Sequence, residues 1–80
     1  MPSPKKKKTV HPAIAAFSTN LRAARHAAKL TQDQLADAAS ISIAYVSLLE
    51  RGGRNPPLTL VHNLAGHLRT TPAELVKAAA

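Results

Sequence analysis

Apolar residues recur at helical spacing in five separate segments of the chain, and no segment shows the sustained alternation of a β-strand. These segments predict helices over about residues 12–29, 32–38, 43–51, 58–68 and from 71 onward. The residues expected to face inward, in chain order, are Ile14, Phe17, Leu21, Ala24, Ala28, Leu35, Ala36, Ala39, Val46, Leu49, Leu58, Val61, Leu64, Ala65 and Leu68. The last predicted helix carries Leu75, Val76 and Ala79, which could form a dimer seam or simply pack on the first helix. The pattern therefore predicts an all-α domain.

The second and third predicted helices are marked by capping residues at their ends. Thr31 and Gln34 have the spacing of a capping box, and Ser42 can cap the third helix. Gly52-Gly53 follows that helix, where glycine is typical. Two short helices joined by a tight turn over about residues 31–51 form a helix-turn-helix unit, whose second helix enters the DNA major groove.

This unit resembles the Cro and phage-repressor (Xre) family of helix-turn-helix proteins. The residues that carry the resemblance are T-Q-x-x-L-A from Thr31 and I-S-x-x-Y-V-S-x-L-E-R-G-x-R-N-P from Ile41, within a similarity that runs from about Leu21 to Val76. The run A-Y-V-S-L-L-E-R-G-G-R-N is most similar to restriction–modification controller proteins, and also resembles plasmid and phage regulators. The resemblance implies a five-helix, lambda-repressor-like DNA-binding domain over residues 12–80.

Two positions depart from the family pattern. Ser40 stands in the turn where the family usually has glycine, because that position tends to need a positive φ. Either Ser40 adopts the strained left-handed conformation, or the turn is shifted by one residue. Arg69 stands where the family often has glycine after the fourth helix.

The net charge of +7 favours nucleic acid as a partner, with anionic membrane as a lesser option. Four of these charges come from Lys5 to Lys8, in a tail over residues 1–11 that we expect to be disordered. The tail could serve as a solvated solubility segment, as a basic arm that follows DNA phosphates, or as a nuclear import signal. The remaining +3 is too modest to identify a DNA-binding domain by charge alone.

The third predicted helix supplies most of the candidate DNA contacts. The complete predicted set is Gln32, Ser42, Ile43, Ala44, Tyr45, Ser47, Leu48, Arg51, Arg54 and Asn55. Ser47 can hydrogen-bond a base edge and Arg54 can read guanine, whereas Ile43, Ala44 and Leu48 can only make apolar contacts, such as with a thymine methyl. The family usually has more polar residues at positions 43 and 44.

Each of these residues also has a purely structural interpretation. Ile43 and Leu48 could be buried in a dimer interface or under the first or fourth helix, and Tyr45 could be an ordinary half-buried aromatic. The family's phosphate-binding glutamine matches Gln32, which could instead belong to the capping network. Arg51, Arg54 and Asn55, which follow the third helix, could instead form a solvated basic turn. The resemblance also implies a structural ion pair between Arg25 and Glu50.

The sequence offers little support for catalysis or metal binding. There is no cysteine, so disulfides, thiol catalysis and cysteine-based zinc sites are excluded. His62 and His67 lie five residues apart rather than the three or four that share a helix face. Asp33 and Asp37 are explained by the dipole at the start of a helix. We expect no enzyme activity, no cofactor and no metal site.

The sequence thus predicts a sequence-specific transcription regulator, most simply a repressor, that binds a palindromic operator as a homodimer through its C-terminal helix. No apolar run approaches the roughly 20 residues of a membrane span, so we expect a cytoplasmic, nucleoid-associated bacterial protein. RNA polymerase or a cognate protein are further candidate partners. Alternatives are an antitoxin or other protein-interaction module with the same fold, and a non-specific nucleic-acid packager that uses the lysine tail.

Overall fold

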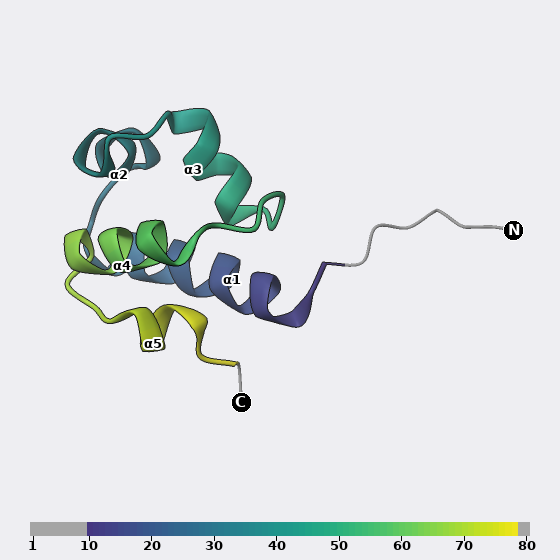
Figure 1. Ribbon diagram of the computed structural model, residues 1–80. Coiled ribbons are helices and arrows are strands. Elements are labelled where there is room, and N and C mark those ends of the chain that lie inside the picture. The colour runs from purple at the N-terminus through teal and green to yellow at the C-terminus, as the bar shows by residue number, and fades with distance from the viewer. Residues whose placement is uncertain (1–9, 79–80) are drawn as a thin grey trace, which may run out of the picture.

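The computed structural model describes residues 10–78, which form five α-helices and no β-strand (Figure 1). The helices are α1 (Pro12–Ala27), α2 (Gln32–Ala39), α3 (Ile43–Glu50), α4 (Leu58–His67) and α5 (Pro72–Val76). Their ends lie within two residues of the predicted ones. Of the predicted tail over residues 1–11, the structure describes only Val10 and His11. Ala79, expected in the last helix, also lies outside the described residues.

The start of each of α1, α2, α3 and α5 is held by a side chain that accepts a hydrogen bond from the backbone. Thr31 Oγ1 accepts from the Gln34 N–H at 3.0 Å, and Gln34 Oε1 accepts from the Thr31 N–H at 2.9 Å. This confirms the predicted capping box. Ser42, Thr71 and His11 accept equivalent bonds at the starts of α3, α5 and α1.

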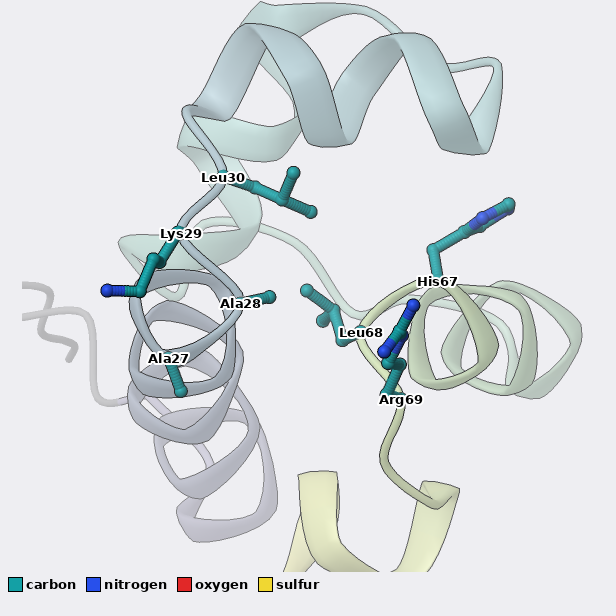
Figure 2. Close-up of a pocket in the computed structure, with 7 residues that line it drawn as sticks. All are labelled: Ala27, Ala28, Lys29, Leu30, His67, Leu68 and Arg69. Carbon is teal, nitrogen blue, oxygen red and sulfur yellow. The ribbon is translucent and has the colours of Figure 1, made fainter.

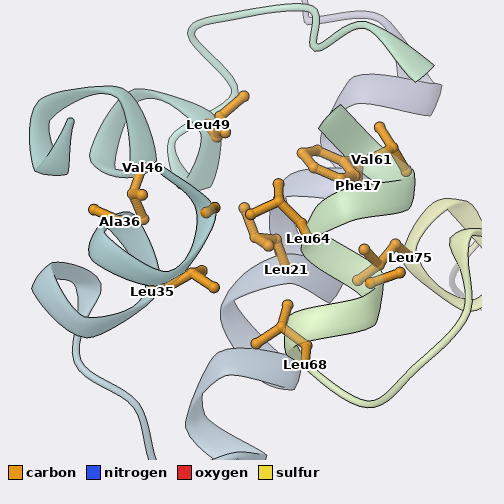
Figure 3. Close-up of a cluster of buried hydrophobic side chains, with 12 residues drawn as sticks. Phe17, Leu21, Leu35, Ala36, Val46, Leu49, Val61, Leu64, Leu68 and Leu75 are labelled. Carbon is orange, nitrogen blue, oxygen red and sulfur yellow. The ribbon is translucent and has the colours of Figure 1, made fainter. Parts of the chain in front are cut away.

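The helices surround one apolar core. Helix α1 packs against α3 and α5, and α4 packs against α2 and α5. Figure 1 shows α2 and α3 together above α1 and α4, with α5 below. The buried apolar side chains, most of them visible in Figure 3, are Phe17, Leu21, Leu35, Ala36, Ala39, Val46, Leu49, Val61, Leu64, Ala65, Leu68 and Leu75. With one aromatic side chain and no tryptophan, this core is small.

Leu58 was expected to face inward, and this prediction is wrong. Its side chain is 82% exposed, although Val61 in the next turn is buried. Helix α4 begins directly after Pro56 and Pro57, so Leu58 occupies a first turn that extends beyond the core.

The short helix α5 packs on α1 through Leu75, which is 1% exposed. The Asn20 amide N–H group donates to the carbonyl oxygens of Leu75 at 3.0 Å and Lys77 at 2.8 Å. Of the two roles left open for Leu75, the structure shows packing on the first helix, so its side chain is not available for a dimer seam. Val76 remains 46% exposed.

Among residues 10–78, three residues other than glycine occupy the left-handed region, and each follows a helix. Ser40 has φ 58° and ψ 43°, so the helix-turn-helix turn has the predicted register and Ser40 adopts the strained conformation. Arg69 has φ 58°, as its position in the family pattern suggested. Lys29 has φ 60°, which the sequence did not reveal.

Replacing Ser40 with glycine should stabilise the domain. Ser40→Gly removes the Cβ that disfavours a left-handed residue, so we expect the free energy of unfolding to rise by about 1 kcal/mol. The matched control is Ala38→Gly on the exposed face of α2, which should lower it by about 1 kcal/mol. Urea unfolding followed by circular dichroism measures both, and a destabilised Ser40→Gly variant would contradict the turn geometry.

Candidate nucleic-acid interface

Helix α3 presents its N-terminal residues to solvent. Val46 and Leu49 are fully buried, and Ser42 Oγ caps the helix by accepting from the Tyr45 N–H at 3.0 Å. On the other side Ile43 is 49% exposed, and Ala44 is also exposed. Ile43 is therefore not buried under α1 or α4, and the two residues form an apolar tip at the start of the helix.

The remaining candidate residues of α3 are only half-buried. Tyr45 packs partly against the core while keeping an accessible side, and Ser47 is half-buried. Leu48 lies over the following turn, because a Cβ on Gly53 would come within 3.2 Å of its Cδ2 atom. Leu48 therefore helps to shape that turn as well as facing outward.

The turn after α3 carries exposed polar and cationic groups. Arg51, Arg54 and Asn55 are all exposed. Arg51 Nε lies 3.4 Å from the Ser47 carbonyl oxygen, and Arg54 Nη1 donates to the Gly53 carbonyl at 3.2 Å. Within residues 10–78 neither guanidinium is paired with a carboxylate. Both charges are thus available to an anion outside the chain.

The C-terminal end of α3 is held by the carboxylate of Glu50, whose side chain is fully buried. Arg25 of α1 donates from Nε to Oε2 at 2.6 Å and from Nη2 to Oε1 at 3.0 Å. Gln32 of α2 donates from Nε2 to Oε1 at 3.1 Å, and Arg22 Nε lies 3.6 Å from the same oxygen. One carboxylate therefore joins α1, α2 and α3.

The pairing of Arg25 with Glu50 was implied by the family resemblance, but the hydrogen bond from Gln32 to Glu50 was not. Gln32 lies at the start of α2, yet its amide group binds Glu50 rather than the capping residues. The amide has a second N–H, which this contact leaves free to donate elsewhere. No local sequence signal links Gln32 to a residue 18 positions away.

Ser18 is a second residue that fixes α3, and no pattern in the sequence indicates it. It is 6% exposed, and its hydroxyl lies 2.7 Å from the Leu49 carbonyl oxygen and 2.9 Å from the Ile14 carbonyl oxygen. Its single proton can be donated to either acceptor. Ser18 thus connects the middle of α1 to the last turn of α3.

The environment of Glu50 lowers its pKa. Burial alone would raise the pKa, but the hydrogen bonds from Arg25 and Gln32 and the positive charges of Arg25 and Arg22 together outweigh it. The pKa of Arg25 is raised, chiefly by its hydrogen bonds to Glu50 and against the effect of burial. The pair is therefore ionised throughout the physiological pH range.

A hollow of about 590 Å³ between the ends of α1 and α4 does not form a convergent anion site (Figure 2). Lys29 and Arg69 both line it, but the Lys29 side chain points away from Arg69.

In the described part of the chain, no three His, Cys, Asp or Glu residues are grouped as metal ligands. None of the helices there is long and apolar enough to cross a membrane.

A family model for the helix-turn-helix domain matches residues 16–78. The chain belongs to this helix-turn-helix family. The matched region contains all of α2 to α5 and most of α1. The chain therefore carries a DNA-binding domain of the transcription-regulator type.

Several solved structures share the fold. The restriction-modification controller protein C.AhdI from Aeromonas hydrophila is 35% identical, with a TM-score of 0.76, and the match covers 81% of this chain and 98% of that one. The clp gene regulator ClgR from Corynebacterium glutamicum is 27% identical, with a TM-score of 0.78 and coverage of 84% and 71%. A hypothetical transcription factor, NHTF, from Neisseria is 24% identical, with a TM-score of 0.80 and coverage of 94% and 86%. The comparison with curated protein sequences gives no match.

The lowered pKa of Glu50 predicts a loss of stability in acid. Because Glu50 binds a proton less readily in the folded chain, its contribution is complete above its ordinary pKa of 4.5 and is lost as the pH falls through the lower folded value. The Glu50→Gln variant should not show this acid-dependent loss of stability below about pH 4.5, because it has no carboxylate to protonate. At pH 7 the substitution should lower the free energy of unfolding by about 3 kcal/mol.

Urea unfolding of the wild type and of Glu50→Gln between pH 3 and pH 7 tests this expectation, in steps of about one pH unit. Glu74→Gln, which removes an exposed carboxylate from α5, is the matched control. Wild type and Glu50→Gln with parallel pH profiles would show that the carboxylate does not connect the three helices in solution.

Proposed function

We propose that this chain is a sequence-specific transcription regulator, acting as a repressor, which binds a palindromic operator as a homodimer. The observation that supports this most strongly is that α3 is exposed at its start and fixed to two other helices at its end. Its first residues, Ile43 and Ala44, are exposed, while its last residue, Glu50, is locked to α1 and α2. A helix held rigidly at one end and free at the other is suited to reading bases in the major groove.

The candidate residues divide into base readers and phosphate binders. Ile43 and Ala44 would contact thymine methyl groups, and Arg54 would donate to guanine O6 and N7. The free N–H of Gln32 and the guanidinium of Arg51 would bind backbone phosphates on either side. Ser42, Tyr45, Ser47, Leu48 and Asn55 complete this set at the edges of α3.

The proposed homodimer needs an apolar surface other than Leu75. Leu58 and Val76 are exposed beside a hollow that Ile14 and Pro56 help to line, and no ionisable residue lines it. Two copies of a chain with net charge +7 repel each other least where they meet without charged groups. An uncharged apolar patch is also complementary to itself under two-fold symmetry.

Such a dimer would occupy two half-sites and block a promoter, or contact polymerase from an adjacent site. It would act in the bacterial cytoplasm, on the nucleoid. The similarity to C.AhdI, a restriction-modification controller protein, makes control of a restriction–modification system one specific role to examine.

Selection of bound sites from a random DNA pool at physiological salt tests sequence-specific binding. We expect a palindromic motif with half-sites about 10 base pairs apart, because a dimer places its two recognition helices about one turn apart. The same motif should be selected by a variant in which Lys5 to Lys8 are all replaced by glutamine, here called the arm-neutral variant. Failure to enrich any motif would favour a packaging protein or a protein-interaction module.

Leu58→Asp should convert the dimer into a monomer, because it buries a carboxylate in an apolar seam. Aspartate in the first turn of α4 is compatible with the helix dipole, so folding should be preserved. Ile43→Asp is the matched control, since it should remain dimeric while losing operator binding. Sedimentation at tens of micromolar measures both, and an unchanged sedimentation coefficient for Leu58→Asp would place the seam elsewhere.

A further inference from the structure

The C-terminal ends of α1 and α4 border the hollow of about 590 Å³ (Figure 2). Ala28 and Leu30 from the end of α1 and Leu68 from the end of α4 point into the space between the two helices. Leu68 is buried, whereas Ala28 and Leu30 are only half-buried, so the chain leaves part of this apolar surface uncovered. None of the residues that line the hollow is a candidate DNA contact.

Cationic side chains lie on both sides of this apolar surface. Lys29 follows α1 and Arg69 follows α4, and both are exposed. His67, the last residue of α4, lies beside Arg69 (Figure 2). Within residues 10–78 neither Lys29 nor Arg69 is in an ion pair, and no carboxylate lines the hollow. The rim is therefore positive and has no acidic partner in the described part of the chain.

The same two cations occupy backbone positions that favour glycine. Lys29 has φ 60° and Arg69 has φ 58°. The N–H group of the next residue closes a Schellman motif in each case, at 3.1 Å from the Arg25 carbonyl oxygen and at 2.9 Å from the Ala65 carbonyl oxygen. The helix dipole favours a cation anywhere in the last turn, so it does not explain a cation at the strained position. Strained residues of this kind often mark a binding function.

The arrangement fits an acidic peptide better than a phosphate backbone. The Lys29 side chain points away from Arg69, so the two cations do not converge on one phosphate group (Figure 2). Each can instead bind a separate carboxylate, on either side of an apolar side chain that covers Leu30 and Leu68. An apolar floor strengthens the binding of a leucine-type side chain but adds nothing to the binding of a phosphate.

We propose that Lys29 and Arg69, with the apolar surface of Ala28, Leu30 and Leu68 between them, form a docking site for a partner protein. The occupant is a short acidic segment of that partner, in which carboxylates flank leucine-type side chains. The inference does not depend on operator binding, because the site shares no residue with the candidate DNA contacts.

The test titrates the isotope-labelled full chain with the capped peptide Asp-Asp-Leu-Leu-Asp-Asp and follows the amide NMR shifts. We expect the largest shifts at residues 27–30 and 67–69. A peptide with asparagine for every aspartate lacks the charge, and a peptide with serine for both leucines lacks the apolar side chains. Each should bind on the order of 10-fold more weakly. The arm-neutral variant should show the same shifts as the wild type, because Lys5 to Lys8 are not part of the site.

Two substitutions of equal charge locate the site. Arg69→Gln removes a cation from the rim of the hollow, and Lys77→Gln removes an exposed cation that does not line it. Arg69→Gln should bind the peptide about 3- to 10-fold more weakly, while Lys77→Gln should match the wild type. Arg69→Gly should weaken binding equally but raise the Tm by about 4 °C, because glycine relieves the left-handed strain. Thermal unfolding followed by circular dichroism measures this second effect.

The outcomes distinguish the acidic segment from other occupants. Equal binding by Arg69→Gln and the wild type, equal binding of either altered peptide, or no shifts at residues 27–30 and 67–69 would overturn the proposal. The same shifts on addition of a random-sequence DNA duplex would also overturn it, because the hollow would then bind polyanions in general. A less stable Arg69→Gly variant would do so too, since the arginine would then serve its own helix end. Peptide binding without any selected operator would support the docking site and reject only the regulator.

Discussion

The buried carboxylate of Glu50 is the interaction on which the rest of the structure depends. Helix α3 faces the core through only two fully buried side chains, Val46 and Leu49, and two apolar contacts do not fix the angle of a short helix. The hydrogen bonds from Arg25 and Gln32 do so, because their geometry is directional and their acceptor is shielded from water. A buried ion pair adds little net stability against an apolar replacement, so its contribution here is orientation.

That orientation is achieved with a thin core. Ala36 and Ala39 let α2 approach α3 closely, but they bury little apolar area, and the core has one aromatic side chain. The chain also keeps strained left-handed residues, such as Ser40, after its helices. A core this small gains from any further apolar burial, and in the proposed homodimer a second copy would supply it at the uncharged patch around Leu58.

Local rules made most of the fold predictable from the sequence. Caps such as Thr31 with Gln34 act over three residues, and a helical apolar stripe needs only its own periodicity. Local rules did not suffice where an element meets the rest of the molecule. Leu58 continues the stripe of α4 but lies past the end of the core, and only the packing of α5 on α1 decided between the two roles left open for Leu75. The contacts that position the site join residues 18 to 31 positions apart, which no local pattern reports.

The distribution of charge follows from the same carboxylate. If Glu50 were exposed, it would place a negative charge beside the turn that carries Arg51 and Arg54. Burying it against Arg25 leaves Arg51 and Arg54 without a carboxylate partner within residues 10–78, although the total charge outside Lys5 to Lys8 is only +3. Under the proposed function, an apolar helix tip would discriminate among bases only through methyl groups and shape, so most of the affinity for DNA would come from phosphates. In the proposed complex, the buried carboxylate of Glu50, whose charge is offset by Arg25, would both orient α3 and keep an exposed negative charge away from the DNA backbone.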